Sequence, residues 1–166
     1  METKKILIPT DFSVKSLELV RKAIVETADQ PLEVVLLHGT ILSNSITDLL
    51  FFSKSKLVKE LQSEEFVEAC TVLKNKYPSK IHSLYVEVIT SNSPAYFRNF
   101  VDATQITEIF VPEEGVLNFK NAKGFNTLSL FSKSGTPCFY FNQEEQEQTE
   151  AVGKKQFANI FLSGLK

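Results

Sequence analysis

Few residues in this sequence carry the chemistry of a catalytic centre. The chain has two histidines, His38 and His82, and two cysteines, Cys70 and Cys138, which form neither a His-Glu-x-x-His pair nor a Cys-x-x-Cys motif. None of its six glycines belongs to a Gly-x-Gly, a Gly-Lys-Ser/Thr or a Gly-x-Ser-x-Gly motif. The usual signatures of zinc enzymes, serine hydrolases and dinucleotide-binding proteins are therefore absent, and we expect neither a catalytic residue nor a metal site.

The histidines and cysteines have simple structural interpretations. His38 ends an apolar run, which favours a buried, hydrogen-bonded imidazole over a group that titrates in a cleft. His82 begins another such run, and we expect it at the surface. Cys70 and Cys138 lie in apolar stretches without the spacing of a disulfide framework, so both are expected to pack as reduced thiols.

Length and composition indicate one globular domain. The chain has 166 residues, of which 43% are hydrophobic and 23% charged. Its net charge is −2 and its only arginines are Arg21 and Arg98, which argues against a nucleic-acid-binding protein. It has no apolar stretch of membrane-spanning length and no signal-peptide pattern, so we expect a cytoplasmic protein without a membrane partner.

The elements that would position a site alternate along the chain. Short apolar runs predict five strands, at residues 4–9, 32–38, 81–90, 106–111 and 136–141. Helical spacing and capping residues predict helices at 14–28 and 55–77, a third that starts at 92–94, and a short one at 127–133. Residues 41–52 suggest a loop with a short helix, and 113–126 a polar loop. This order predicts an α/β fold with a parallel sheet and helices on both faces.

The composition changes after residue 142. Residues 143–150 contain no apolar side chain and suggest a solvated linker, and an apolar cluster follows at Phe157, Ile160, Phe161 and Leu165. We therefore divide the chain into a domain at 1–142 and an appendage at 143–166. The appendage could be a vestigial strand of a second domain, or a tail that packs on its own domain or across a dimer.

Two segments carry a resemblance to a known family. The run Ile-Leu-Ile-Pro-Thr-Asp-Phe-Ser at residues 6–13 resembles the first strand and turn of the universal stress proteins, and Leu-Leu-His-Gly at 36–39 resembles the end of their second strand. The resemblance implies a Rossmann-like three-layer sandwich with a five-stranded parallel sheet in the order 3-2-1-4-5. It also implies a ligand crevice at the carboxyl ends of strands 1 and 4.

The resemblance further implies which residues line that crevice. They would be Pro9, Thr10, Asp11 and Gly39, together with the loop at 112–125. Asp11 could contact an adenine nucleotide there, or it could cap the first helix; both interpretations stay open.

The loop at 112–125 departs from the family pattern for ATP binding. Many members have Gly-x2-Gly-x9-Gly-Ser/Thr, in which glycines let backbone amides approach phosphate. Here Gly115 and Gly124 fall on the second and third glycines with one residue missing between them, whereas Pro112 replaces the first and Phe125 replaces the hydroxyl residue. Proline removes a backbone donor, and Phe125 removes a hydroxyl and fills space.

The charges of this loop oppose one another. Glu113 and Glu114 add negative charge near the expected phosphates, and Lys120 and Lys123 partly offset it. The resemblance therefore implies a degenerate site with at most weak affinity for ATP or AMP. The alternative is an adenine-nucleotide-binding, slowly ATP-hydrolysing protein with Asp11, Gly115 and Gly124 in its site. A sensor that binds another small molecule in an aromatic crevice is a further alternative.

The resemblance also implies a partner surface. Members of the family usually form dimers through the fifth strand, which here contains Phe139, Tyr140 and Phe141, three of the sequence's aromatic side chains. We therefore expect a non-catalytic stress-response module that forms a homodimer and contacts a protein partner that the sequence does not identify.

Overall fold

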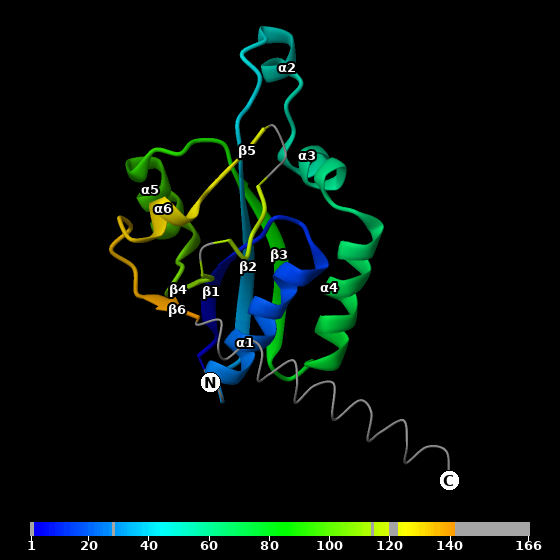
Figure 1. The fold of residues 1–166 in the computed structure, drawn as a ribbon, viewed down its shortest axis with the longest axis vertical. Coiled ribbons are helices and arrows are strands. Elements are labelled where there is room, and N and C mark those ends of the chain that lie inside the picture. Colours follow the sequence, from blue (N-terminus) through cyan, green and yellow to red (C-terminus); the bar gives the residue numbers. More distant parts are fainter. Residues whose placement is uncertain (1, 28, 114, 120–122, 142–166) are drawn as a thin grey trace.

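A parallel sheet with helices on both faces forms the centre of the computed structural model, which describes residues 2–27, 29–113, 115–119 and 123–141 (Figure 1). The parallel strands are β1 (Lys4–Pro9), β2 (Leu32–Thr40), β3 (Ile81–Ile89), β4 (Glu108–Val111) and β6 (Cys138–Tyr140). Their order in the sheet is β3-β2-β1-β4-β6. The predicted α/β sandwich and the predicted order 3-2-1-4-5 are therefore confirmed.

Two apolar cores hold the three layers together, because successive side chains of a strand point to opposite faces. On one face, Ile6 and Ile8 of β1 pack with the 3-10 helix η1 (Val14–Leu17) and with the helices α1 (Glu18–Glu26) and α4 (Glu64–Lys76). On the other face, Leu7 packs with α5 (Pro94–Thr104) and α6 (Leu128–Phe131).

The region predicted as one helix at 55–77 contains two helices. These are α3 (Lys54–Leu61) and α4, and the chain is extended between them at Gln62. Ser63 starts the second helix, since its hydroxyl accepts a hydrogen bond from the Phe66 amide at 3.1 Å. The apolar spacing continues across the break, so hydrophobic periodicity alone concealed this capping signal.

A narrow arm projects from the domain between β2 and α3. It carries the short helix α2 (Ile46–Leu50), in agreement with the expected loop and short helix (Figure 1). Its apolar side chains stand free of the core: Ile46 is 76% exposed and Phe51 is 79% exposed. Within the described part of the chain, no helix has the length and hydrophobicity needed to cross a membrane.

The polar loop predicted at 113–126 is wrong in its second half. Gly124 and Phe125 form a short strand, β5, that pairs antiparallel with Gly39 and Thr40 at the end of β2. Leu117, earlier in the same loop, is buried in the core. Glu114, residues 120–122 and the appendage at 143–166 lie outside the described residues, so the predictions made for them stay predictions.

Candidate functional site

The turn after β1 holds the first of the expected site residues. Pro9 and Thr10 are buried, and the Thr10 amide donates to the Leu37 carbonyl of β2 at 2.8 Å. The Thr10 hydroxyl is 2.9 Å from the hydroxyl of Ser16. Thr10 therefore connects β1, β2 and η1 through its own hydrogen bonds and presents no free polar group to a ligand.

Asp11 is held by hydrogen bonds within the protein. Its Oδ1 accepts from the amide and hydroxyl of Ser13, and its Oδ2 accepts from the amide of Asn118 at 2.9 Å. Ser13, not Asp11, is the cap of the first helical segment, since the Ser16 amide donates to the Ser13 hydroxyl at 3.2 Å. Asp11 thus orients the capping residue and connects the turn after β1 to the loop at 112–125.

Phe125 occupies the space beside Gly39. The two residues are paired across β2 and β5, and the Phe125 ring lies so close that a Cβ added to Gly39 would be 2.5 Å from the ring atom Cε2. The backbone of the same segment is anchored to β2, because the Ile41 amide donates to the Lys123 carbonyl at 2.7 Å. Only a glycine leaves room for this ring at the end of β2.

A separate cluster of rings surrounds His38 on the opposite face of the sheet from Phe125. Phe12 lies with its ring centre 4.7 Å from the His38 ring, and Phe119 lies at 6.4 Å. Phe12 has φ of +63°, an uncommon backbone conformation for a non-glycine residue, and its ring also contacts Phe66 at 5.5 Å. Leu117 is buried in the same core.

His38 is a neutral, buried imidazole, as expected. It is 3% exposed, and its Nδ1 lies 3.0 Å from the Thr10 carbonyl. Because a carbonyl oxygen only accepts, Nδ1 carries the proton. Burial lowers the pKa of His38, and the hydrogen bond to Thr10 only partly opposes that effect.

Of the remaining expected site residues, Gly124 lies next to Gly39 across the pairing of β2 with β5, whereas Gly115 lies on an exposed turn. Gly115 is exposed on a turn with φ of +89°, and a Cβ there would meet no atom within 4 Å. Gly124 pairs with Thr40 in β5. The Lys123 carbonyl contacts β2, and the residue is exposed. Lys120 and Glu114 lie outside the described residues.

The sequence analysis missed the part played by Phe12, Leu117 and Phe119. The signal was present, because Leu117 and Phe119 alternate with polar residues as in a strand with one buried side. Two glycines and several charges nearby made the segment resemble an open loop. These residues pack on the α1 and α4 side of the sheet, whereas Phe125 packs on the α5 and α6 side and forms an aromatic plug at the carboxyl end of β2.

The other reactive side chains form no second site. Among the described residues, no group of three or more histidine, cysteine, aspartate or glutamate side chains could hold a metal ion. Cys70 and Cys138 are half-buried free thiols, and burial raises the pKa of Cys70 to about 11. Both cysteines therefore behave as packing residues rather than nucleophiles.

Comparison with known proteins supports the fold. No protein-family model matches the sequence, and no curated protein is similar to it. A universal stress protein family member from Burkholderia pseudomallei has 12% sequence identity and a TM-score of 0.50, over 83% of this chain and 95% of that chain.

Two further solved structures are similar. For UspA from Lactobacillus plantarum the identity is 12% and the TM-score 0.49, over 84% of this chain and 97% of that chain. For a universal stress protein family member from Arabidopsis thaliana with AMP bound, the values are 13% and 0.42, over 86% and 94%. Taken with the strand order, the match to the Burkholderia protein shows that this chain has the fold of the universal stress proteins.

Proposed function

We propose that this protein is a non-catalytic stress-response module that binds adenine nucleotides weakly or not at all and acts as a homodimer through protein contacts. One observation supports the proposal: the ring of Phe125 lies against Gly39, a residue that the family resemblance assigns to the lining of the nucleotide crevice. A ligand that enters there must first displace this ring.

Displacement of the plug has an energetic cost that lowers affinity. The ring would leave its contacts with the core formed by α5 and α6, and the pairing of β5 with β2 would be lost. Full exposure of a buried large apolar side chain costs about 1.5–3 kcal/mol, and Phe125 is only partly buried, so its release costs about 1 kcal/mol. Every 1.4 kcal/mol weakens binding by about tenfold, so this step alone lowers nucleotide affinity by about fivefold.

The polar groups around the plug do not compensate for this cost. Both carboxylate oxygens of Asp11 already accept hydrogen bonds from Ser13 and Asn118, and the charge of Asp11 repels phosphate. Pro112 supplies no amide donor, and Glu113 adds a second negative charge. These features favour the proposed function over a nucleotide-dependent one.

The homodimer contact is proposed at the edge of the sheet. β6 is the last strand in the sheet order and pairs on one side with β4. Phe139 is 47% exposed and Tyr140 is 65% exposed, whereas Phe141 is 4% exposed and stacks on Phe110 at 5.4 Å. Phe141 thus belongs to the core of its own chain, and the proposed contact rests on Phe139 and Tyr140.

Calorimetric titration with Mg-ATP and with AMP tests the proposed loss of binding. We expect the wild-type protein to bind both with a Kd weaker than about 10 μM. Phe125→Ser removes the ring and introduces the hydroxyl of the family pattern, and we expect it to bind at least about tenfold more tightly.

Phe51→Ser is the matched control for this titration, because it removes an exposed phenylalanine on the arm, far along the chain from the plug. It should leave the titration unchanged. A wild-type Kd below about 10 μM for either nucleotide would contradict the proposal and would favour the nucleotide-binding alternative.

A further inference from the structure

An apolar groove runs between η1, α1 and α4 on the outer side of the domain. Its walls include Val14 and Leu17 from η1 and Ala69, Val72 and Leu73 from α4, and its volume is about 450 Å³. Val14 is 46% exposed and Val72 is 58% exposed. Such a run of uncovered apolar side chains is typical of a docking surface.

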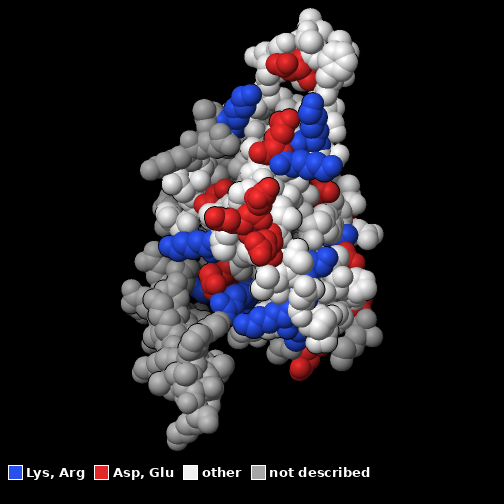
Figure 2. Space-filling model, turned by 90° about the vertical axis from the view of Figure 1, so that its right-hand side faces the viewer, with Lys and Arg blue, Asp and Glu red and all other residues white. Residues whose placement is uncertain are grey.

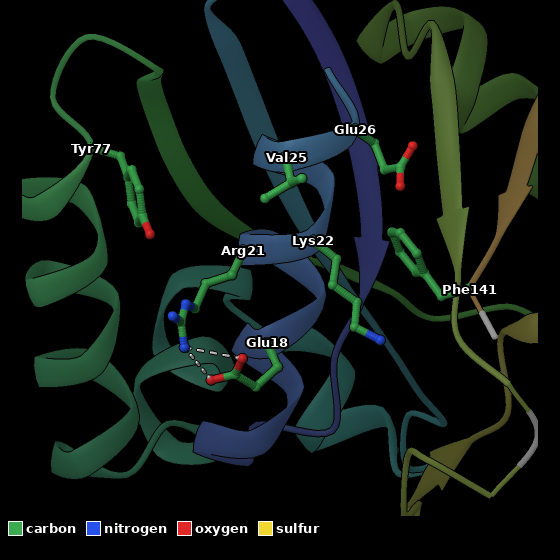
Figure 3. Close-up of a pocket in the computed structure, with 7 residues that line it drawn as sticks. All are labelled: Glu18, Arg21, Lys22, Val25, Glu26, Tyr77 and Phe141. Atoms are coloured by element: carbon green, nitrogen blue, oxygen red, sulfur yellow. Dashed lines mark hydrogen bonds and ion pairs between the residues drawn. The ribbon is translucent and has the colours of Figure 1, made fainter. Parts of the chain in front are cut away.

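A second, smaller hollow lies along α1 and shares two lining residues with the groove. It has a volume of about 140 Å³ and lies between α1, Tyr77 and Phe141, as Figure 3 shows. Glu18 and Arg21, which form an ion pair at 3.1 Å, line both hollows. Val25, at its rim, is 73% exposed.

The described part of the chain ends at the smaller hollow. Phe141 is the last described residue, and its ring forms one wall of the smaller hollow (Figure 3). Phe157 follows sixteen residues later, a span that reaches up to about 50 Å when extended. A domain of this size has a radius of gyration of about 14 Å, so the linker easily spans the distance to the groove.

The segment at the far end of this linker matches the groove in polarity. Phe157, Ile160, Phe161 and Leu165 are spaced as on one face of a helix. An apolar face of this width needs an apolar partner surface, because it would otherwise remain in water. Val14, Val72 and Leu73 offer such a surface, within reach of the same chain.

The segment also matches the groove in charge. Residues 151–166 contain Lys154, Lys155 and Lys166 and no acidic residue. Glu65, Glu68 and Lys76 line the groove together with the Glu18–Arg21 ion pair, so the groove has a net charge of −1, and among the described residues neither Glu65 nor Glu68 forms an ion pair. Figure 2 looks onto the side of the domain that carries α4 and shows acidic side chains gathered in the middle of this face. Charges of opposite sign favour the association and its orientation.

From these observations we propose that residues 157–165 pack as an amphipathic helix into the groove between α1 and α4 of their own chain. The four apolar side chains cover Val14 and Val72, and Lys154 and Lys155 lie near Glu65 and Glu68. The covalent linker favours the own-chain arrangement, because it holds the segment at a local concentration in the millimolar range. The proposal is independent of nucleotide binding and of the β6 contact.

Hydrogen exchange of the full-length protein, measured by mass spectrometry, tests this arrangement. We expect amides of 157–165 to exchange at least about tenfold more slowly than amides of the linker at 143–150. Val72→Asp places a charge in the groove and should abolish this protection. Val67→Asp makes the same change on α4, at a 46% exposed residue that does not line the groove, and should leave the protection in place.

A second variant keeps the test independent of the fold of α4. Phe157→Ser combined with Phe161→Ser changes only the segment, and we expect it to speed exchange at Val14 and along α4 by about tenfold. Unprotected wild-type amides at 157–165, or protection that survives Val72→Asp, would overturn the proposal. A mixture of the Val72→Asp protein with the Phe157→Ser/Phe161→Ser protein completes the experiment. Protection restored in that mixture would show docking into a second copy and would also overturn the proposal.

Discussion

The crevice expected at the ends of the strands and the groove beside α1 differ in whether the chain's own side chains fill them. In the crevice, Phe125 lies against Gly39, and Asp11 bonds to Ser13 and to the Asn118 amide. In the groove, Val14 and Val72 remain exposed among the described residues. The chain's own side chains therefore fill the space beside Gly39, whereas the described residues leave the groove uncovered.

This difference indicates which surfaces of the molecule remain uncovered. Topology determines that a crevice exists at the reversal of strand order, and the loop between β4 and β5 determines whether it is open. Uncovered apolar side chains lie instead on the arm, on the outer helices and on the β6 edge.

The largest expected effect concerns the exposed side chains of β6. Tyr140→Asp places a charge at the edge strand β6, and we expect it to convert the proposed dimer to a monomer, which would halve the mass measured by light scattering. Phe51→Asp, which changes a 79% exposed residue of the arm, is the control and should leave the mass unchanged. A dimer that tolerates Tyr140→Asp but not Phe51→Asp would place the contact on the arm.

A smaller expected effect tests whether the Phe125 ring fills the space beside Gly39. Gly39→Ala puts a methyl group where the Phe125 ring lies, and we expect it to lower the free energy of unfolding by about 1–3 kcal/mol. Phe125→Ala in the same chain removes the clash, so the double variant should be more stable than the sum of the two single changes by about 1 kcal/mol, measured by urea denaturation. Gly39→Ala combined with Phe119→Ala should show no such rescue. Strict additivity with Phe125→Ala would mean that the plug does not occupy this site.

The smallest expected effect concerns the pH dependence of stability that His38 causes. Burial lowers the pKa of His38 in the folded state below its ordinary value of 6.5. As the pH falls below about 6.5, His38 takes up a proton in the unfolded chain but not in the folded chain. The contribution of neutral His38 to the free energy of unfolding is therefore fully present above this pH and is lost as the pH falls below it.

Urea denaturation between pH 5 and pH 8 measures this slope, which reaches at most about 1.4 kcal/mol per pH unit. His38→Gln should flatten it relative to the wild type, and His82→Gln, which changes an exposed histidine, should not. An unchanged slope in His38→Gln would assign the pH dependence to other groups.

Much of the fold could be predicted from local patterns. The buried runs at 4–9 and 32–38 are strands because a strand covered on both faces needs continuous apolar residues. The proline at 94 after a polar cap starts α5, as expected. The break between α3 and α4 was missed because Ser63 acts through one hydrogen bond that apolar spacing does not reveal.

The position of the candidate site could be predicted from the sequence, but the contacts that fill it could not. The run at 6–13 and Gly39 indicated where the crevice lies, and Phe125 was recognised as a residue that could fill space there. The pairing of β5 with β2, the Asp11–Asn118 hydrogen bond and the rings around His38 depend on contacts between residues far apart in the chain. Phe141 was misjudged for the same reason, since its burial against Phe110 depends on the neighbouring strand.

The sequence by itself determined the alternation of strands and helices, the reversal of strand order through the family resemblance, and the absence of the usual catalytic motifs. Local periodicity, caps and residue types are sufficient for these conclusions, because they depend on neighbours along the chain. Only the tertiary structure decided that the loop folds back into the crevice and that an apolar groove remains open beside α1. Those features arise where separate segments meet, and the space between side chains is a property of the packed molecule.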